Sequence, residues 1–166
     1  MITAVIRARH GIEALTATLS SLVPGVAEGL VADAVVVVEA EDPDTSRVTN
    51  AVGAACLVLS AGGDPWRLGL TVARREWLLC LESGDLPGTG WITVLERFLG
   101  GPRPVPLARL GRRPLRPAER LARWRDHLLG AEAPRPGDLV SRALLEAWPG
   151  RVRPARLGLI LERLPG

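Results

Sequence analysis

The sequence predicts an α/β fold, a three-layer sandwich in which helices cover both faces of a mostly parallel sheet. Over the first hundred residues, four short apolar runs alternate with segments whose apolar residues recur at helical spacing. One run, AVVVV at residues 34–38, is a continuous β-branched stretch of the kind found in strands covered on both sides. Strands and helices that alternate in this way imply parallel pairing through right-handed crossovers.

The elements expected in this half follow from those patterns and from their proline and glycine breaks. A Pro-Gly loop near Pro24 is expected to end the first helix. The fourth helix presents Trp91, Leu95 and Phe98 on one face, which suits a core. The expected strands are residues 2–8, 34–40, 56–60 and 77–82, and the expected helices are residues 12–22, 43–53, 66–75 and 91–99.

The second half changes character, since proline, glycine and arginine become frequent after residue 100. Residues 105–110, VPLARL, are expected to form either a surface excursion or an edge strand. Helix resumes at Pro117, with Leu121, Trp124 and Leu128 expected to face inward. Its arginines are expected to lie largely outward: Arg120, Arg123 and Arg125. The ending, LGLILERLPG, is interpreted as a terminal helix, and residues 1–166 together as one domain.

Charge narrows the classes of partner. The chain has 21 arginines, no lysine and a net charge of +3. Residues 1–96 carry six arginines against twelve acids, whereas residues 97–126 carry nine arginines against two acids. A nucleic-acid role is not favoured, because a general nucleic-acid binder would show basic stripes with stacking aromatics. The basic segment better suits phosphates or an anionic membrane surface.

The amino terminus and the apolar runs bear on location. MITAVIRARH lacks the basic start and the long apolar core of a signal peptide. The longest apolar runs are far shorter than a membrane span. A cytoplasmic location is therefore expected, with peripheral binding at the inner membrane face as a further option.

The stretch WLLCLESGDLP, residues 77–87, is the strongest candidate site. An apolar run stops there at Glu82 and Asp85, which would lie at the carboxyl end of a buried strand. Ligands of open α/β sheets bind beyond those strand ends, and carboxylates placed there can hold a divalent cation that carries a phosphate. Ser-Gly-Asp is also ordinary turn chemistry, so an acidic turn without a ligand remains the alternative.

Two further groups of residues lie at neighbouring strand ends. Glu39, with Glu41, Asp42 and Asp44 after it, could accept hydrogen bonds from a ribose or a base, or could simply form a solvated turn. Arg9 follows the first strand, and its guanidinium could bind a diphosphate bidentately.

The sequence lacks the motifs of several enzyme classes and of common metal sites. There is no Gly-x-Ser-x-Gly nucleophile elbow, and a P-loop is excluded because its lysine is absent. No Gly-x-Gly-x-x-Gly follows the first strand, which argues against a nicotinamide enzyme. The cysteine and histidine spacings match no metal site.

Three segments in order resemble family 2 glycosyltransferases of the GT-A fold. They are AVIRARHGIEALTATLSSL, VVVVEAEDPDTS and WLLCLESGDLPGTGW. The resemblance implies that residues 1–99 are a nucleotide-binding half and residues 100–166 a truncated acceptor-side half. The chain departs from the family pattern at Arg7, at His10-Gly11, and at the metal motif, where Gly84 stands in place of the second acid. The later segment that should carry a general base has only Glu162.

The resemblance implies inverting transfer of a sugar from a nucleotide-diphosphate donor, with turnover weak or absent. Arg9, Glu39 and Asp44 would bind the nucleotide, and Glu82 with Asp85 would bind Mg²⁺ or Mn²⁺. The alternative is a non-catalytic GT-A scaffold whose segment Arg97–Arg125 binds a protein partner or an anionic membrane. A wide-open crevice beside Glu82 and Asp85 would favour catalysis, and one filled by Trp66, Trp91 or arginine side chains would favour that scaffold.

Overall fold

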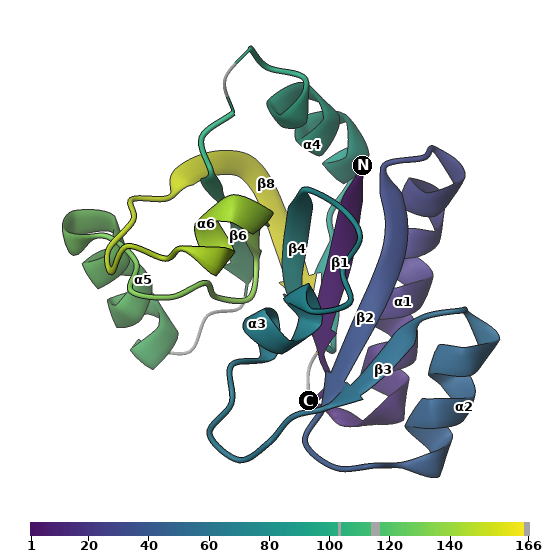
Figure 1. The fold of residues 1–166 in the computed structure, drawn as a ribbon. Coiled ribbons are helices and arrows are strands. Elements are labelled where there is room, and N and C mark those ends of the chain that lie inside the picture. The colour runs from purple at the N-terminus through teal and green to yellow at the C-terminus, as the bar shows by residue number, and fades with distance from the viewer. Residues whose placement is uncertain (103, 114–116, 165–166) are drawn as a thin grey trace.

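The computed structural model describes the chain except for residues 103, 114–116 and 165–166. Eight strands form one sheet in the order β3-β2-β1-β4-β7-β6-β8-β5 (Figure 1). The strands are β1 Ile2–Arg7, β2 Val31–Val38, β3 Ala55–Val58, β4 Trp77–Glu82, β5 Asp85–Pro87, β6 Leu107–Arg113, β7 Asp138–Ser141 and β8 Ala155–Arg163. The helices are α1 Gly11–Ala27, α2 Pro43–Ala51, α3 Pro65–Leu70, α4 Trp91–Leu99, α5 Pro117–Leu129 and α6 Arg142–Glu146.

The α/β class and the parallel pairing of the first four strands are confirmed. β1 pairs in parallel with β2 on one side and with β4 on the other, and β2 pairs in parallel with β3. The register places Arg7, at the end of β1, beside Glu82, at the end of β4. The carboxyl ends of these strands therefore meet at one edge of the sheet.

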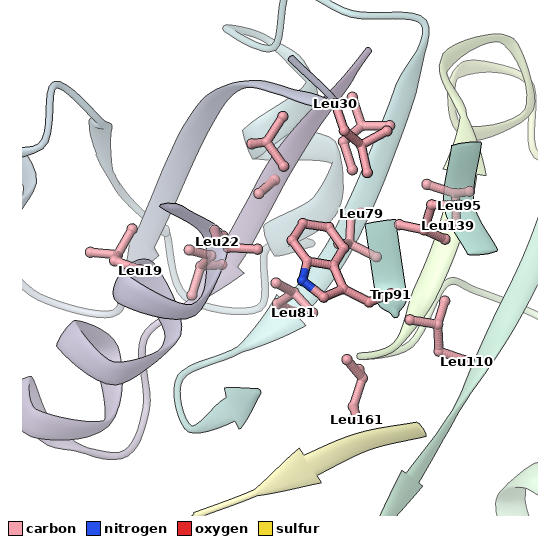
Figure 2. Close-up of a cluster of buried hydrophobic side chains, with 14 of the residues drawn as sticks. Leu19, Leu22, Leu30, Leu79, Leu81, Trp91, Leu95, Leu110, Leu139 and Leu161 are labelled. Atoms are coloured by element: carbon pink, nitrogen blue, oxygen red, sulfur yellow. The ribbon is translucent and has the colours of Figure 1, made fainter. Parts of the chain in front are cut away.

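Alternate residues of the central strands supply two separate cores, as expected for a sheet covered on both faces. On one face, Ile6 and Leu81 pack with α1 and α4, and Trp91 lies centrally among leucines from both helices and from the sheet (Figure 2). On the other face, Val5 and Cys80 pack with α3 and α6. This three-layer arrangement fixes the strand ends that carry the candidate site.

The first helix continues through Pro24 to Ala27, so the predicted loop at that point is wrong. Proline removes only its own N–H bond to the preceding turn, and bonding beyond it is kept, since the backbone N–H of Glu28 donates to the carbonyl of Pro24 at 3.0 Å. Gly25 is needed for packing, since a Cβ there would lie 2.4 Å from the ring of Trp91. The Pro-Gly pair thus serves a close helix-to-helix contact.

The second half extends the sheet in ways that the sequence interpretation missed. β6 lies between β7 and β8, so the predicted edge strand or surface excursion is wrong. The predicted terminal helix is also wrong, because residues 157–163 belong to β8, which pairs in parallel with β6 and antiparallel with β5; residues 165–166 of that prediction lie outside the described residues. Strand β8 forms hydrogen bonds with both β6 and β5. This pairing is long-range, so local apolar spacing does not reveal it.

Helix α5 lies at the outer side of the molecule (Figure 1), and the prediction that its apolar residues face inward is wrong. Arg120 and Arg125 are exposed as predicted, whereas Arg123 turns inward and donates to the carbonyls of Leu110 and Pro136. Leu121, Trp124 and Leu128 are 67%, 62% and 47% exposed, whereas Asp126 is wholly buried. The inward face is polar because Asp126 pairs with Arg109 of β6 and with Arg135. Buried charges that find such partners decide how the helix faces.

The remaining differences are small. β2 ends at Val38, so Glu39 follows the strand rather than closing it, and α3 ends at Leu70. Within the described part of the chain, no helix is both long enough and apolar enough to cross a membrane.

Candidate functional site

The candidate site begins where β1 and β4 end side by side. The backbone N–H of Ser83 bonds to the carbonyl of Arg7 at 2.9 Å, which extends the pairing by one step. The buried hydroxyl oxygen of Ser83 then accepts from the backbone N–H groups of Arg9 and His10, at 2.9 and 3.0 Å. Ser83 therefore ties the loop after β1 to the turn after β4 and fixes both.

Glu82 and Asp85 do come together at this edge, and a guanidinium joins them. Arg112 of β6 donates from Nε to Asp85 Oδ1 and from Nη2 to Glu82 Oε2, both at 2.7 Å. The other oxygen of Asp85 accepts the backbone N–H of Glu82 at 2.8 Å. Asp85 is wholly buried and Arg112 is 4% exposed. The two carboxylates thus share one buried cation supplied by the chain.

A second guanidinium, that of Arg163, enters from β8. The β5–β8 register sets Arg163 opposite Asp85, and its Nη2 lies 3.3 Å from Glu82 Oε2. The same nitrogen lies 2.6 Å from Nε2 of His10. Because a guanidinium only donates, this ring nitrogen of His10 must accept. Glu119 of α5 approaches both Arg112 and Arg163, at 3.5 and 3.4 Å.

The pKa shifts follow from burial and from these partners. Burial alone would raise the pKa of Glu82, but the hydrogen bond and charge of Arg112 and the charge of Arg163 lower it below its ordinary value. Burial outweighs Arg112 at Asp85 and raises the pKa of that carboxyl. Burial alone would lower the pKa of Arg112, yet Asp85 and Glu82 raise it, so this guanidinium stays charged.

The turn between the two acids depends on Gly84. Its φ of +91° lies in the region that favours glycine. Its backbone N–H is held by the hydroxyl of Thr18, at 2.8 Å, and by the carbonyl of Ala14, at 3.1 Å. The glycine at the position of the family's second acid is therefore required by this backbone.

These residues do not fit a divalent cation as they are arranged. Both oxygens of Asp85 already accept hydrogen bonds, and Arg112 lies between the two carboxylates. Among the described residues, no group of three or more histidine, cysteine, aspartate or glutamate side chains could hold a metal. A hard cation needs free carboxylate or carbonyl oxygens, and this pair offers few. The metal role of Glu82 and Asp85 stays a prediction.

The predicted nucleotide residues separate into two groups. Glu39 accepts from Arg7 Nη2 at 3.0 Å and lies 3.4 Å from Arg9 Nε. Arg9 and Glu39 line one cavity of about 370 Å³. Asp42 caps α2 by accepting from the backbone N–H of Thr45, whereas Asp44 pairs with Arg47 on the exposed face of that helix. Arg9 and Glu39 are thus brought together, and Asp44 lies apart from them.

Arginines also line two further cavities. Arg7, Glu82 and Arg112 line a cavity of about 200 Å³. Arg112 and Arg163 line a larger cavity of about 1010 Å³, whose wall includes Gly88, Thr89 and Glu162. These two cavities share Arg112, and the cavity beside Glu39 is linked to them through the ion pairs of Glu39 with Arg7 and Arg9.

Comparison with known proteins identifies the fold. No protein-family model matches the chain, and no curated protein matches it in sequence. Glucosyl-3-phosphoglycerate synthase from Mycobacterium tuberculosis, in complex with Mn²⁺, UDP and glucosyl-3-phosphoglycerate, matches with a TM-score of 0.67 at 16% identity, over 98% of this chain and 70% of that chain. The chain has the GT-A fold. S. aureus TarS 1–349 in complex with UDP-GlcNAc matches with a TM-score of 0.63 at 13% identity, over 100% of this chain and 60% of that one.

The match is partial in length. In the complex of the same synthase with Mn²⁺, UDP and phosphoglyceric acid, it covers 88% of this chain and 57% of that chain. For TarS 1–349 without a named ligand, it covers 48% of that chain. The chain therefore spans about half to seven tenths of these GT-A structures. At such identities the match shows the fold alone, so function is argued from this chain's own residues.

Sequence reasoning missed the residues that fill the GT-A crevice. Arg112, Arg163 and Glu119 all come from the second half, where the strands were misassigned. The one available signal was the dense arginine content of residues 97–126. It could indicate a basic surface but could not indicate which arginine turns inward.

Proposed function

We propose that this chain binds a nucleoside-diphosphate sugar at the carboxyl ends of β1, β2 and β4. One observation carries the proposal: each of three cavities is lined by arginine, with Arg9 beside Glu39, Arg7 and Arg112 beside Glu82, and Arg112 and Arg163 beside Glu162. Guanidinium groups match phosphate oxygens bidentately. The GT-A fold and neighbours crystallised with UDP or UDP-GlcNAc support the same class of ligand.

Each cavity suits a different part of the donor: the base and ribose, the diphosphate, or the sugar. The cavity beside Arg9 and Glu39 would receive the base and ribose, with Glu39 accepting hydrogen bonds from hydroxyls. The diphosphate would lie against Arg7, Arg112 and Arg163, and the sugar would enter the large cavity beside Gly88 and Glu162. Asp44 would contact the nucleotide base. Because Asp44 already pairs with Arg47, we expect this contact to contribute less to affinity than that of Glu39.

Sugar transfer with inversion is the finer proposal, in keeping with family 2. It needs a base that takes the proton of the acceptor hydroxyl. Glu162 is exposed on β8 and lines the large cavity. Among the described residues, no ion pair occupies its carboxylate. Glu162 is therefore the candidate base, whereas Glu82 and Asp85 are held by Arg112.

Calorimetric titration of the protein with UDP- and GDP-sugars tests donor binding. We expect one saturable site for at least one donor, weakened by Arg9→Gln and unchanged by Arg151→Gln, which removes an exposed arginine that pairs with Glu132. Flat isotherms for all of these donors, with and without Mn²⁺, would contradict the proposal. Mass spectrometry for released sugar or glycosylated acceptor tests transfer, and Glu162→Gln should abolish it while donor binding stays.

A second function is favoured by the outer face of α5. Leu121, Trp124 and Leu128 are exposed together as one stripe, and at helical spacing the exposed Arg120 and Arg125 flank that stripe around the helix axis. Helices that carry tryptophan and leucine between arginines bind at membrane surfaces, with the charges attracted to anionic lipid. We propose an anionic membrane as the occupant of this face, either alongside donor binding or as the role of a non-catalytic scaffold.

Sedimentation with vesicles of mixed anionic and neutral lipid tests the second function. We expect binding that falls steeply as salt rises, because exposed charges are screened. Trp124→Ala should weaken binding at every salt concentration, and Arg125→Gln should weaken it chiefly at low salt. Equal recovery with purely neutral vesicles, or none with anionic ones, would contradict a membrane role and leave a protein partner as the alternative.

A further inference from the structure

The guanidinium of Arg112 occupies the place that a metal shared by Glu82 and Asp85 would need. Its two donors reach one oxygen of each carboxylate at the same distance, 2.7 Å. A planar fork of donors can bridge two carboxylates rigidly. Arg112 is also held on β6 in the middle of the sheet, between β7 and β8. The bridge is therefore part of the folded scaffold.

The chain itself balances the charge of Glu82 and Asp85. Two carboxylates with one divalent cation have no net charge, and the same is true of Glu82 and Asp85 with Arg112 and Arg163. Glu119 of α5 approaches both guanidinium groups from their other side, at 3.5 and 3.4 Å, and adds a third carboxylate. Arg163 contributes directly, since its Nη2 lies 3.3 Å from Glu82 Oε2. The chain itself thus supplies the two positive charges that a bound metal would bring.

Few ligand positions are left for a cation. Three of the four carboxylate oxygens accept hydrogen bonds from the chain: Asp85 Oδ1, Asp85 Oδ2 and Glu82 Oε2. The fourth, Glu82 Oε1, lies 3.8 Å from Nε2 of His10. A metal would have to displace Arg112 from a carboxylate that is wholly buried.

We propose that Arg112 and Arg163 replace the divalent cation, so that a nucleoside diphosphate binds this chain without a metal. The inference rests on the proposed function, because it concerns how the same site holds a diphosphate. Both arginines line the large cavity, where N–H groups that do not bond to Glu82 or Asp85 can face a phosphate. Arg112 keeps the acidic turn neutral, and Arg163, nearer to solvent, contacts the ligand.

Titration of the protein with UDP in EDTA, and again with excess Mn²⁺, separates the outcomes. We expect the same dissociation constant in both buffers, within about twofold. Binding that requires Mn²⁺ would overturn the inference and leave the proposed function standing. No binding in either buffer would overturn both.

Glu82→Gln should change the affinity for UDP in opposite directions, depending on whether a metal ion or the two arginines hold the diphosphate. A metal site would lose a ligand, so UDP would bind more weakly. If Arg112 and Arg163 hold the diphosphate, the substitution removes a competing negative charge and UDP should bind about three- to tenfold more tightly in EDTA. Glu132→Gln, at an exposed carboxylate that pairs with Arg151, is the matched control and should change nothing. Weaker binding by Glu82→Gln would overturn the inference.

Arg163→Gln tests the contact with the ligand without uncovering Asp85. Binding of UDP in EDTA should weaken by at least about tenfold, the cost of a charged hydrogen-bond donor, and circular dichroism checks that the variant is folded at the titration temperature. Paramagnetic resonance of Mn²⁺ added to the ligand-free protein should show only the spectrum of the free ion. A bound Mn²⁺ signal that Asp85→Asn removes, or UDP binding unaffected by Arg163→Gln, would overturn the inference.

Discussion

Arg112 and Asp85 form a buried ion pair in which the Nε and Oδ1 atoms lie 2.7 Å apart. The pair also positions the neighbouring turn. The other oxygen of Asp85 accepts the backbone N–H of Glu82 and so fixes the turn that carries both acids. Burial of such charges is tolerated only when each finds a partner with good geometry. The pair therefore links the stability of the domain to the shape of its candidate site.

Arg112→Gln should destabilise the protein strongly. The substitution leaves Asp85 buried without its counter-charge, and breaking a buried pair in this way costs about 3–5 kcal/mol. Urea unfolding measures the loss. Arg113→Gln, at the next and exposed position of β6, should cost less than about 0.5 kcal/mol. Similar losses for the two variants would mean that Arg112 is not the partner of Asp85.

Gly84→Asp should not create a working metal motif. The φ of +91° is strained for any residue with a Cβ, so we expect a loss of about 1–3 kcal/mol in the free energy of unfolding. Gly158→Asp is the control, because no atom lies within 4 Å of a Cβ built there and no positive φ is involved. A Gly84→Asp variant as stable as wild type that also gains Mn²⁺ binding would contradict this reading of the turn.

The stability of the protein should fall in acid through Asp126. Burial alone would raise the pKa of this carboxyl, but its bonds to Arg135 and Arg109 lower it below the ordinary 3.8. Because this pKa is lower in the folded protein than in the unfolded chain, the stabilisation that ionised Asp126 contributes is complete above pH 3.8. It is lost as the pH falls through the pKa of the folded protein. Urea unfolding between pH 7 and pH 2 measures it.

Asp126→Asn is the reference for that acid profile. The variant should be less stable than wild type at pH 7, and the difference should shrink only below about pH 4. A constant difference across the whole range would show that Asp126 does not titrate with a lowered pKa.

Two tryptophans should respond differently to truncation. Trp91 is buried in the first core, so Trp91→Ala should cost about 3–5 kcal/mol. Trp124 is 62% exposed on α5, so Trp124→Ala should change the free energy of unfolding by less than about 1 kcal/mol. Chemical unfolding of both variants compares them directly. A large loss at Trp124 would restore the inward face that the sequence predicted.

The first half of the fold could be predicted because its signals are local. Residues 77–82 and 91–99 form the strand and the helix expected from their apolar patterns. Once the strands are parallel, their carboxyl ends must share an edge, so the meeting of Arg9 with Glu39 follows from the sequence. The same reasoning brings Glu82 and Asp85 together at the next strand.

The second half could not be predicted because distant partners decide it. Arg112 and Arg163 are 30 and 81 residues from Glu82 along the chain, and only the pairing of β6 and β8 brings them near. The outward apolar face of α5 depends on ion pairs between Asp126 and arginines outside that helix. Apolar spacing predicts which face is hydrophobic, but buried charges with partners can turn that face outward.

In the proposed binding mode, arginines hold a diphosphate at the carboxyl ends of the central strands. The most direct test is the isotherm of UDP with the protein in EDTA, compared between wild type and Arg163→Gln. We predict saturable binding by wild type and binding at least about tenfold weaker for the variant. A flat wild-type isotherm in EDTA, or equal affinities for the two proteins, would contradict the account.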